Sequence, residues 1–211
     1  MEIISLDKID STQKYLIERI EKREIIGSTV VIAKEQCRGM GSRDNTWSSV
    51  LGDLLFSFAL LEKNLPKDLP LASSSIYFAY IMKEVLKKYD QNIWLKWPND
   101  IYYLDQKVGG IVTKKVFDHL VCGIGINLKK DSNAFEALDI GVEPIIVLKE
   151  YLDELDKNQN WKQIFMKYKL EFNHNKDIST HISGEKTSLE NAFLCDDGSL
   201  IINKKRIYSL R

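Results

Sequence analysis

The sequence predicts an α+β fold in which helices pack on a mixed, largely antiparallel sheet. Apolar stretches typical of strands lie only a few residues apart at 93–97 and 101–103, and again at 108–116 and 120–126, as hairpin strands do. Helical patterns occur along the chain, but not in a regular strand–helix alternation, so an all-parallel sheet is disfavoured.

The N-terminal part is expected to form a strand, a helix and a second strand. Residues 3–6 are a short apolar run, and Asp10-Ser11-Thr12 offers N-cap oxygens to a helix that continues to about Lys22. The inward face of this helix is assigned to Tyr15, Leu16 and Ile20. The β-branched run 29–33 reads as the second strand.

A long loop is predicted next, followed by a strand and a helix. Residues 36–50 are polar, contain glycine and lack periodicity, and loops of this length in compact domains are usually functional or mobile. Residues 54–61 form an apolar strand, and 64–70 a turn with two prolines. The helix is expected over 71–89, with an inward stripe of Ile76, Ala79, Tyr80, Val85 and Leu86.

The remaining strands are the two hairpins, which turn at Pro98 and at Phe117-Asp118. Residues 129–142 look irregular, and 144–155 and 161–172 are amphipathic helices.

The tail changes character from about residue 182. It predicts short strands at 188–194, 200–202 and 206–210, with an Asp196-Asp197-Gly198 turn signal. We therefore expect two units, a main domain over 1–178 and a small β module over 179–211.

Composition excludes several classes of protein. The 211 residues carry 30 Lys+Arg and 30 Asp+Glu, so no basic footprint for nucleic acid is present. The scattered Cys37, Cys122 and Cys195 show no CxxC pattern, and the three histidines have no ligand spacing. The charged start and the absence of an 18-residue apolar run predict neither export nor membrane insertion, hence a cytoplasmic protein.

Three motifs within 32 residues carry the chemistry. They are Lys96-Trp97-Pro98-Asn99-Asp100, then residues 107–112 (KVGGIV), then Gly123-Ile124-Gly125-Ile126-Asn127. A lysine on a buried strand needs an anion to neutralise it, and glycine lets a backbone approach a ligand closely. Together the motifs predict a site for phosphate and a second anion. Taken singly, the first could be a strand ending in a proline turn with an exposed Asp100, and Gly109-Gly110 could be a bulge.

The motifs resemble those of biotin protein ligases, the biotin–[acetyl-CoA-carboxylase] ligases, in the family's order and over nearly the whole chain. KWPND is unchanged, 107–112 matches K-x-G-G-I-hydrophobic, and 123–127 matches G-I-G-I-N. Residues 10–13 stand where the family has S-T-N, and 36–47 where it has Q-x-x-G-R-G-R-x-G-R-x-W. The resemblance implies a catalytic fold like that of class II aminoacyl-tRNA synthetases, with an SH3-like C-terminal module that begins near Ile182-Ser183-Gly184.

The chain also departs from the family pattern. Gln13 replaces Asn, and in the loop Met40 and Ser42 replace two arginines, while Arg38 and Arg43 lie one residue away from the expected places. Asp44 and Asn45 stand where Gly and Arg are usual. Unless the shifted arginines reach the same spot, the activated intermediate is expected to dissociate sooner than in a relative with both arginines. The helix-turn-helix domain that some members carry ahead of the catalytic domain is not expected here.

The resemblance implies ATP, Mg²⁺ and biotin as ligands and two half-reactions. Biotin is first activated as biotinyl-5′-AMP, and biotin is then transferred to a lysine of the biotin carboxyl carrier protein. Lys96 and Lys107 are expected to be the catalytic cations, and Asp100 to organise Mg²⁺ or, alternatively, to cap the turn after Pro98. A homodimer is one of the oligomeric states left open.

The remaining site residues are assigned to the two ligands. The biotin-binding set is expected to be Ser11, Thr12, Gln13, Gln36, Gly39, Met40, Gly41, Ser42, Lys107, Gly110, Ile111, Val112, Gly123 and Gly125, with Ile124 lining the same apolar slot. The nucleotide-binding set is Arg38, Arg43, Trp47, Lys96, Asn99, Asn127 and Phe135. Trp47 could instead anchor its loop in the core, and Asn127 could stabilise a turn.

Two alternatives remain from the sequence. A lipoate–protein ligase or octanoyltransferase shares the fold and the transfer to lysine, but the ureido-binding set and the GIGIN strand favour biotin. A non-catalytic biotin-binding regulator would not need phosphate-binding cations, so Lys96 and Lys107 with Asp100 argue against it.

Overall fold

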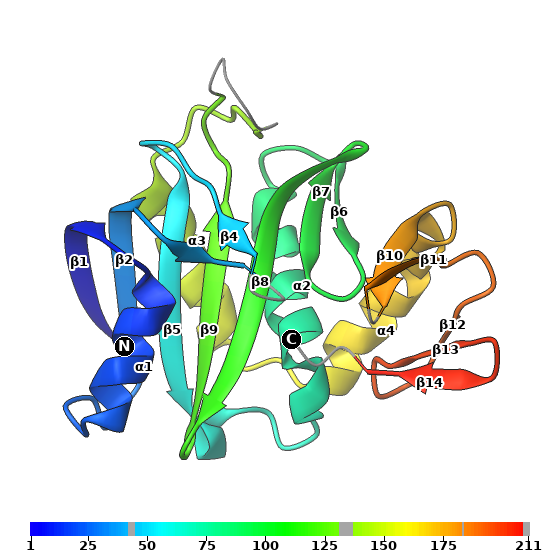
Figure 1. The fold of residues 1–211 in the computed structure, drawn as a ribbon, viewed down its shortest axis with the longest axis horizontal. Coiled ribbons are helices and arrows are strands. Elements are labelled where there is room, and N and C mark those ends of the chain that lie inside the picture. Colours follow the sequence, from blue (N-terminus) through cyan, green and yellow to red (C-terminus); the bar gives the residue numbers. More distant parts are fainter. Residues whose placement is uncertain (42–44, 131–136, 183, 209–211) are drawn as a thin grey trace.

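The computed structural model describes residues 1–41, 45–130, 137–182 and 184–208. Its centre is a seven-stranded sheet (Figure 1). The strands run in the order β1 (Glu2–Ile9), β2 (Thr29–Gln36), β5 (Leu54–Leu61), β9 (His119–Ile126), β8 (Gln106–Val116), β7 (Asp100–Tyr103) and β6 (Ile93–Lys96). Only the β1–β2 pair is parallel. The predicted α+β class with a largely antiparallel sheet is confirmed.

Helices cover both faces of the sheet and produce two cores (Figure 1). Helix α1 (Thr12–Glu21) buries Leu16, Ile17 and Ile20 on one face. Helices α2 (Ser74–Leu86), α3 (Pro144–Asp156) and α4 (Trp161–Glu171) pack on the other. Because α2 contacts the sheet as well as both α3 and α4, it is buried almost all round, which is why one inward stripe does not describe it.

Four local predictions need correction. The stretch 36–50 is not free of secondary structure, because β3 (Gly39–Met40) pairs with β4 (Thr46–Trp47). The helix expected over 71–89 begins as a 3-10 turn, Leu71–Ser73, and α2 ends at Leu86. The first strand extends beyond 3–6 because β1 pairs along nearly its whole length with β2. No continuous strand spans 188–194, because the chain turns after Ser188.

The C-terminal tail is made of short strands, as expected. Strands β10 (Ser179–Ile182) and β11 (Glu185–Ser188) form a hairpin. Strands β12 (Phe193–Leu194), β13 (Leu200–Ile202) and β14 (Lys205–Ile207) form a small sheet. Leu189, Leu194 and Leu200 are buried in the same core as α2 and α4. A division of the chain at residue 178 stays a prediction.

A buried ion pair joins α2 to α4. The side chain of Lys83 has no exposed surface, and its Nζ lies 2.8 and 2.7 Å from the two carboxylate oxygens of Glu171. Glu84 approaches the same ammonium at 2.7 Å. The ammonium also sits 4.0 Å from the ring centroid of Tyr80. Burial and the two carboxylates raise the pKa of Tyr80, so its hydroxyl stays protonated.

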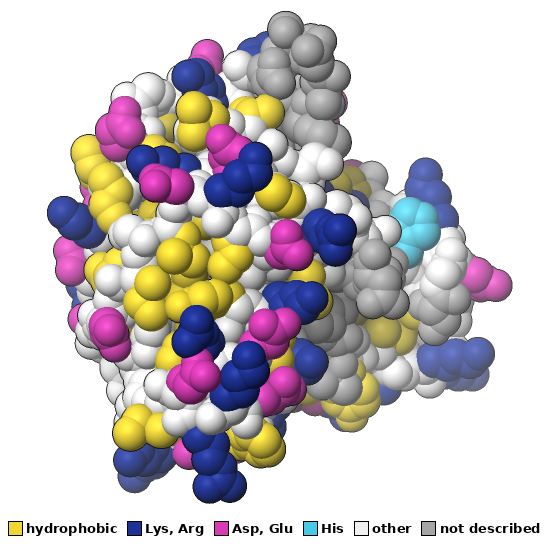
Figure 2. Space-filling model, turned by 60° about the vertical axis from the view of Figure 1, so that its left-hand side comes forward, with side chains coloured by type: hydrophobic (Ala, Val, Ile, Leu, Met, Phe, Trp, Pro, Cys, Tyr) yellow, Lys and Arg dark blue, Asp and Glu magenta, His cyan; other side chains and the backbone are white. Residues whose placement is uncertain are grey.

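The surface on the β1 side carries a cluster of hydrophobic side chains, with basic and acidic side chains interspersed around it (Figure 2). Such mixing agrees with the zero net charge of the sequence. Within the described residues, no helix is both long and apolar enough to cross a membrane.

Candidate functional site

A cavity opens between the start of α1, the β3–β4 pair and the strands β8 and β9. It contains residues from all three sequence motifs and from the loop. The lining comprises Ser11, Thr12, Gln13, Gln36, Met40, Gly41, Trp47, Phe56, Ser57, Asn99, Asp100, Lys107, Gly110, Ile111, Val112, Gly123, Ile124 and Gly125.

An ion pair forms part of the cavity lining. Lys107 Nζ is 2.7 Å from Asp100 Oδ1. The hairpin of β7 and β8 brings the two together, because Asp100 pairs with Gly110 and the pairing then shifts by a bulge near Tyr102. The Lys107 side chain is 40% exposed and that of Asp100 22%, so the ammonium is held in place but still open to an anion.

Lys96, the other predicted cation, does not line the cavity. It pairs with Asp100 across the β6–β7 hairpin, but its Nζ donates to the hydroxyl of Tyr102 at 3.0 Å and lies 4.9 Å from the centroid of that ring. A lysine has four rotatable side-chain bonds, so this ammonium can swing toward a bound anion.

Another part of the lining is a polar wall, made of Ser11, Thr12, Gln13, Gln36 and Ser57. Gln36 Oε1 accepts from the backbone nitrogen of Thr12 at 2.7 Å and from its hydroxyl at 3.1 Å, and the hydroxyls of Thr12 and Ser57 are 2.8 Å apart. Gln13 donates to the carbonyl of Val112 at 3.4 Å. Ser11 is the N-cap of α1, where its Oγ accepts from Lys14 N. The wall thus offers several donors and acceptors in fixed positions next to apolar side chains.

The indole of Trp47 lines the same cavity and packs close to two of its glycines. A Cβ on Gly125 would lie 2.7 Å from the indole, and one on Gly110 would lie 3.4 Å away. Gly39 is equally crowded, with Trp47 O at 2.8 Å. Indole Nε1 is buried and has no hydrogen-bond partner among the described residues. Gly110, Gly123 and Gly125 were expected to admit a ligand. Here the nearest neighbour of Gly110 and Gly125 is Trp47, and that of Gly123 is Gln13.

The cavity is consequently small. Its volume is about 40 Å³, whereas sites for small molecules commonly span roughly 300–1,000 Å³. A ligand the size of a vitamin therefore requires the Trp47 ring to move. Because Trp47 sits on a strand of only two residues, such a movement disrupts few backbone hydrogen bonds.

Gly125→Ala is expected to displace the Trp47 ring, because a 2.7 Å contact with an aromatic ring cannot be tolerated without movement. Gly110→Ala is the matched control, since its added carbon meets the same ring at an ordinary 3.4 Å. The measurement is acrylamide quenching of tryptophan fluorescence, with Trp47→Phe used to assign the signal. Equal quenching of both alanine variants would contradict this packing.

Asn99 connects the KWPND turn to β8. Its Nδ2 donates to Ile111 O at 2.6 Å, and Ile111 N donates to Asn99 O at 2.9 Å. Its buried Oδ1 has no hydrogen-bond partner among the described residues and belongs to a side chain that lines the cavity. It is therefore an available acceptor for a ligand.

Other predicted residues lie elsewhere. Arg38 is at the surface, with its side chain 82% exposed and its guanidinium 4.0 Å from Asp10. Asn127 is buried and does not line the cavity; its backbone bonds to Val108 and Leu138. Ser42, Arg43 and Phe135 fall outside the described residues.

Two lining residues, Phe56 and Ser57, were missed by the sequence analysis. Both lie on β5, which is buried along nearly its whole length. Ser57 is the only polar residue in the run LLFSFALL. A lone hydroxyl in an otherwise apolar central strand was the signal that could have identified it.

A buried carboxylate links the 36–50 stretch to the segment that follows β9. Asp53 is 3% exposed and accepts from the backbone nitrogens of Val50 (2.8 Å), Leu128 (3.0 Å) and Lys129 (3.3 Å). Burial raises the pKa of Asp53, although these three hydrogen bonds oppose the shift. Asp53 thereby ties the end of the 36–50 stretch to the start of the 129–142 stretch.

Within the described ranges, no cluster of three or more His, Cys, Asp or Glu side chains could hold a metal ion. Asp100 is a single carboxylate already paired with Lys107. Mg²⁺ typically keeps substrate phosphate oxygens and one or two carboxylates as ligands, so the ion fits here only as part of a nucleotide substrate.

Comparisons with known proteins point in one direction. A family model described as the biotin/lipoate A/B protein ligase family matches residues 5–131. The bifunctional ligase/repressor BirA of Salmonella typhimurium is 32% identical, over 97% of this chain and 64% of that protein. The chain thus spans just under two thirds of this relative's length.

Solved structures agree. Biotin acetyl coenzyme A carboxylase synthetase from Helicobacter pylori, solved with bound biotinylated ATP, is 38% identical with a TM-score of 0.93, covering 98% of this chain and 99% of that one. Biotin protein ligase from Aquifex aeolicus in complex with biotin and ATP has a TM-score of 0.77 at 23% identity, which supports the fold alone.

Proposed function

Because this chain belongs to the biotin/lipoate A/B protein ligase family, we propose that it is an ATP-dependent ligase that activates biotin as biotinyl-5′-AMP and attaches it to a protein lysine. The observation that carries the proposal is one cavity lined both by a polar wall and by the Lys107–Asp100 pair. A urea group suits the first, and a carboxylate beside a phosphate suits the second.

In the first half-reaction a carboxylate oxygen of biotin bonds to the α-phosphorus of ATP, and the bond to the pyrophosphate oxygen breaks. Two anions must approach each other, so fixed cations lower the barrier. We assign this role to Lys107, which faces the cavity, and to Lys96 after it leaves Tyr102. Asp100 holds Lys107 in place. Mg²⁺ arrives bound to the nucleotide, and its contact with Asp100 stays part of the proposal.

Biotin is placed with its ureido ring against Thr12, Gln36 and Ser57, whose hydroxyl and amide groups offer both donors and acceptors. Its thioether ring and valeryl chain then lie along the apolar side of the cavity. Phe56, Ile111, Val112 and Ile124 provide that side.

In the second half-reaction a lysine amine attacks the acyl carbon of the mixed anhydride, and AMP leaves. We propose the biotin carboxyl carrier protein of acetyl-CoA carboxylase as acceptor. The Helicobacter pylori relative, which this chain matches over nearly its full length, is named for that carboxylase. Since ATP and this acceptor occur in the cytosol, we place the reaction in the cytoplasm.

The test is incubation of the protein with MgATP and biotin, lipoate or octanoate in separate reactions, followed by mass spectrometry for the acyl-adenylate. Biotinyl-5′-AMP formed only with biotin is the expected result. Lipoyl-AMP in preference to biotinyl-AMP would make the chain a lipoate ligase, and no adenylate with any acid would contradict a ligase. Transfer is then tested on a carrier domain and on its acceptor Lys→Arg variant.

Ligand is expected to protect the 36–50 stretch from protease, since Trp47 must leave the cavity and the loop must then exclude water from the anhydride. The Arg38 side chain is 82% exposed, so trypsin can reach it in the free protein and cleave the bond to Gly39. Limited trypsin digestion with and without biotin plus ATP measures the effect. Equal cleavage in both states would contradict it.

A further inference from the structure

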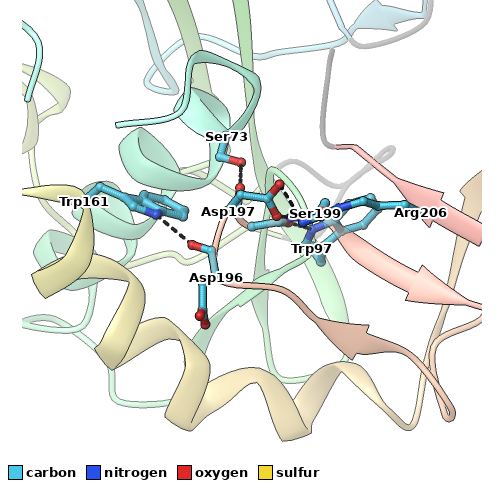
Figure 3. A network of polar contacts seen from close by, with 8 residues as sticks. Ser73, Trp97, Trp161, Asp196, Asp197, Ser199 and Arg206 are labelled. Atoms are coloured by element: carbon cyan, nitrogen blue, oxygen red, sulfur yellow. Dashed lines mark hydrogen bonds and ion pairs between the residues drawn. The ribbon is translucent and has the colours of Figure 1, made fainter. Parts of the chain in front are cut away.

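The turn between β12 and β13 presents three successive backbone carbonyls to the main body of the protein (Figure 3). Asp196 O accepts from Trp161 Nε1 of α4 at 3.0 Å. Asp197 O accepts from the hydroxyl of Ser73, just before α2. Gly198 O accepts from Trp97 Nε1, in the KWPND turn, at 2.9 Å. We refer to residues 196–198 as the carbonyl clamp.

The clamp is rigid in itself. Gly198 N donates to Cys195 O, and Cys195 N donates to Ser199 O, both at 2.8 Å. The Asp197 carboxylate accepts from Ser199 N, Ser199 Oγ and Arg206 Nη2 at 3.1, 2.6 and 2.9 Å. Burial acts to raise the pKa of Asp197, but these hydrogen bonds outweigh it and lower the pKa, so the carboxylate stays charged.

Gly198 is required at its position for two reasons. Its φ of +80° is a conformation that side chains disfavour. A Cβ there would also lie 2.6 Å from Ser73 Oγ and 2.9 Å from Ile76 Cδ1. The third carbonyl of the clamp is therefore aimed at Trp97 by a backbone that only glycine adopts without strain.

Trp97 joins the clamp to the candidate site. Its side chain has no exposed surface, and its backbone nitrogen donates to Asn175 Oδ1 at 2.7 Å. Asn175, also fully buried, donates to Leu95 O at 3.1 Å. Trp97 does not line the cavity. Its neighbours in the chain do carry the polar groups, with Lys96 before it and Asn99-Asp100 just after.

We propose that Trp97, held by the carbonyl of Gly198, is a positioning residue that fixes the Lys96–Asp100 turn for the nucleotide phosphates. The inference rests on the proposed ligase function. A turn that shifts by about 1 Å can lose on the order of 10² in rate when it carries groups that must meet a reacting atom. The turn between the C-terminal strands thus helps to position the site through Trp97, without touching substrate.

The effect is selective for nucleotide. The polar wall assigned to biotin comes from α1, β2 and β5 through Thr12, Gln36 and Ser57, and none of the three clamp bonds reaches these elements. Loosening the clamp at Trp97 therefore alters ATP use much more than biotin binding, whose polar contacts it leaves in place.

The test compares Trp97→Phe with Trp161→Phe. Each substitution removes one indole N–H donor to the clamp, but only Trp97 adjoins Lys96. Thermal melting, the biotin Kd by calorimetry, and KM and kcat for ATP in biotin-dependent pyrophosphate release are measured for both. Gly198→Ala, with Ser73→Ala as its control, is a second pair that leaves both indoles intact.

Trp97→Phe is expected to reduce kcat/KM for ATP roughly 3–10-fold, as loss of one hydrogen bond would, with the biotin Kd within about twofold. Trp161→Phe lowers the melting temperature but leaves ATP use near that of the wild type. Parallel loss of ATP use in both variants, or loss of biotin binding in Trp97→Phe, would overturn the proposal. If Trp97→Phe does not fold, Gly198→Ala decides by the same criteria. A wild-type protein that releases no pyrophosphate would overturn the ligase function itself.

Discussion

Lys107→Ala is expected to reduce kcat/KM for biotin-dependent pyrophosphate release by roughly 10²–10³, the usual effect of removing one preorganised group that stabilises developing charge. Lys107 is the cavity-lining lysine and sits 2.7 Å from Asp100. Its ammonium is therefore in position before the nucleotide binds. A group that needs no reorganisation during the reaction contributes most to the rate.

The fold should tolerate this substitution. The Lys107 side chain is 40% exposed, and exposed ion pairs contribute only about 0.2–1 kcal/mol. Lys114→Ala is the matched control, since Lys114 is an exposed lysine on the same strand. Pyrophosphate release and thermal melting are measured together. Near-normal release by Lys107→Ala would remove Lys107 from the mechanism.

The Lys107–Asp100 ion pair depends on local structure, because the two residues lie on adjacent strands of one hairpin. Strands at 101–103 and 108–116 were expected and both residues were assigned to one site, but the turn that joins these strands was not predicted. By contrast, the sequence indicates a cation at position 96 but does not show in which direction the Lys96 side chain points. In the structure that ammonium lies on Tyr102 instead of in the cavity, because a flexible side chain takes the nearest favourable partner.

The role of Trp47 was not predictable in the same way. Gly110 and Gly125 were recognised as positions of close approach, but the sequence does not say what approaches them. The answer depends on the β3–β4 pair, which has only two residues in each strand and no recognisable pattern. Either a ligand or an indole ring can pack closely against a glycine, because glycine has no Cβ. The glycines alone therefore do not show which of the two approaches them.

The tail illustrates the limit of local patterns most directly. Its Asp197-Gly198 turn was predicted from two residues, and a turn is found there. The partner of that turn, Trp97, lies 101 residues earlier in the chain. Tertiary contacts of this separation leave no periodicity in a single sequence, so the clamp emerges only from the structure.

Glu171→Ala is expected to destabilise the protein by about 3 kcal/mol, because removing one partner of a buried ion pair leaves the other charge uncompensated. The lysine concerned, Lys83, has no exposed surface, and both carboxylate oxygens of Glu171 lie within 2.8 Å of its ammonium. The loss falls at the lower end of the usual range, since Glu84 still reaches the ammonium at 2.7 Å.

Lys83→Met separates charge from packing at the same place. It removes the buried cation and keeps an apolar chain of similar length, while the Glu171 side chain, 27% exposed, can still be hydrated. Removing one partner is costly when the remaining charge is buried, and here the remaining carboxylates of Glu171 and Glu84 are partly exposed, so Lys83→Met should lose less stability than Glu171→Ala. Urea unfolding of both variants measures the two free energies. If Lys83→Met is the more damaging, the ion pair itself stabilises the contact between α2 and α4. The expected order instead means that the pair chiefly selects which helix surfaces meet, since a mismatched helix would leave the Lys83 ammonium buried and unpaired.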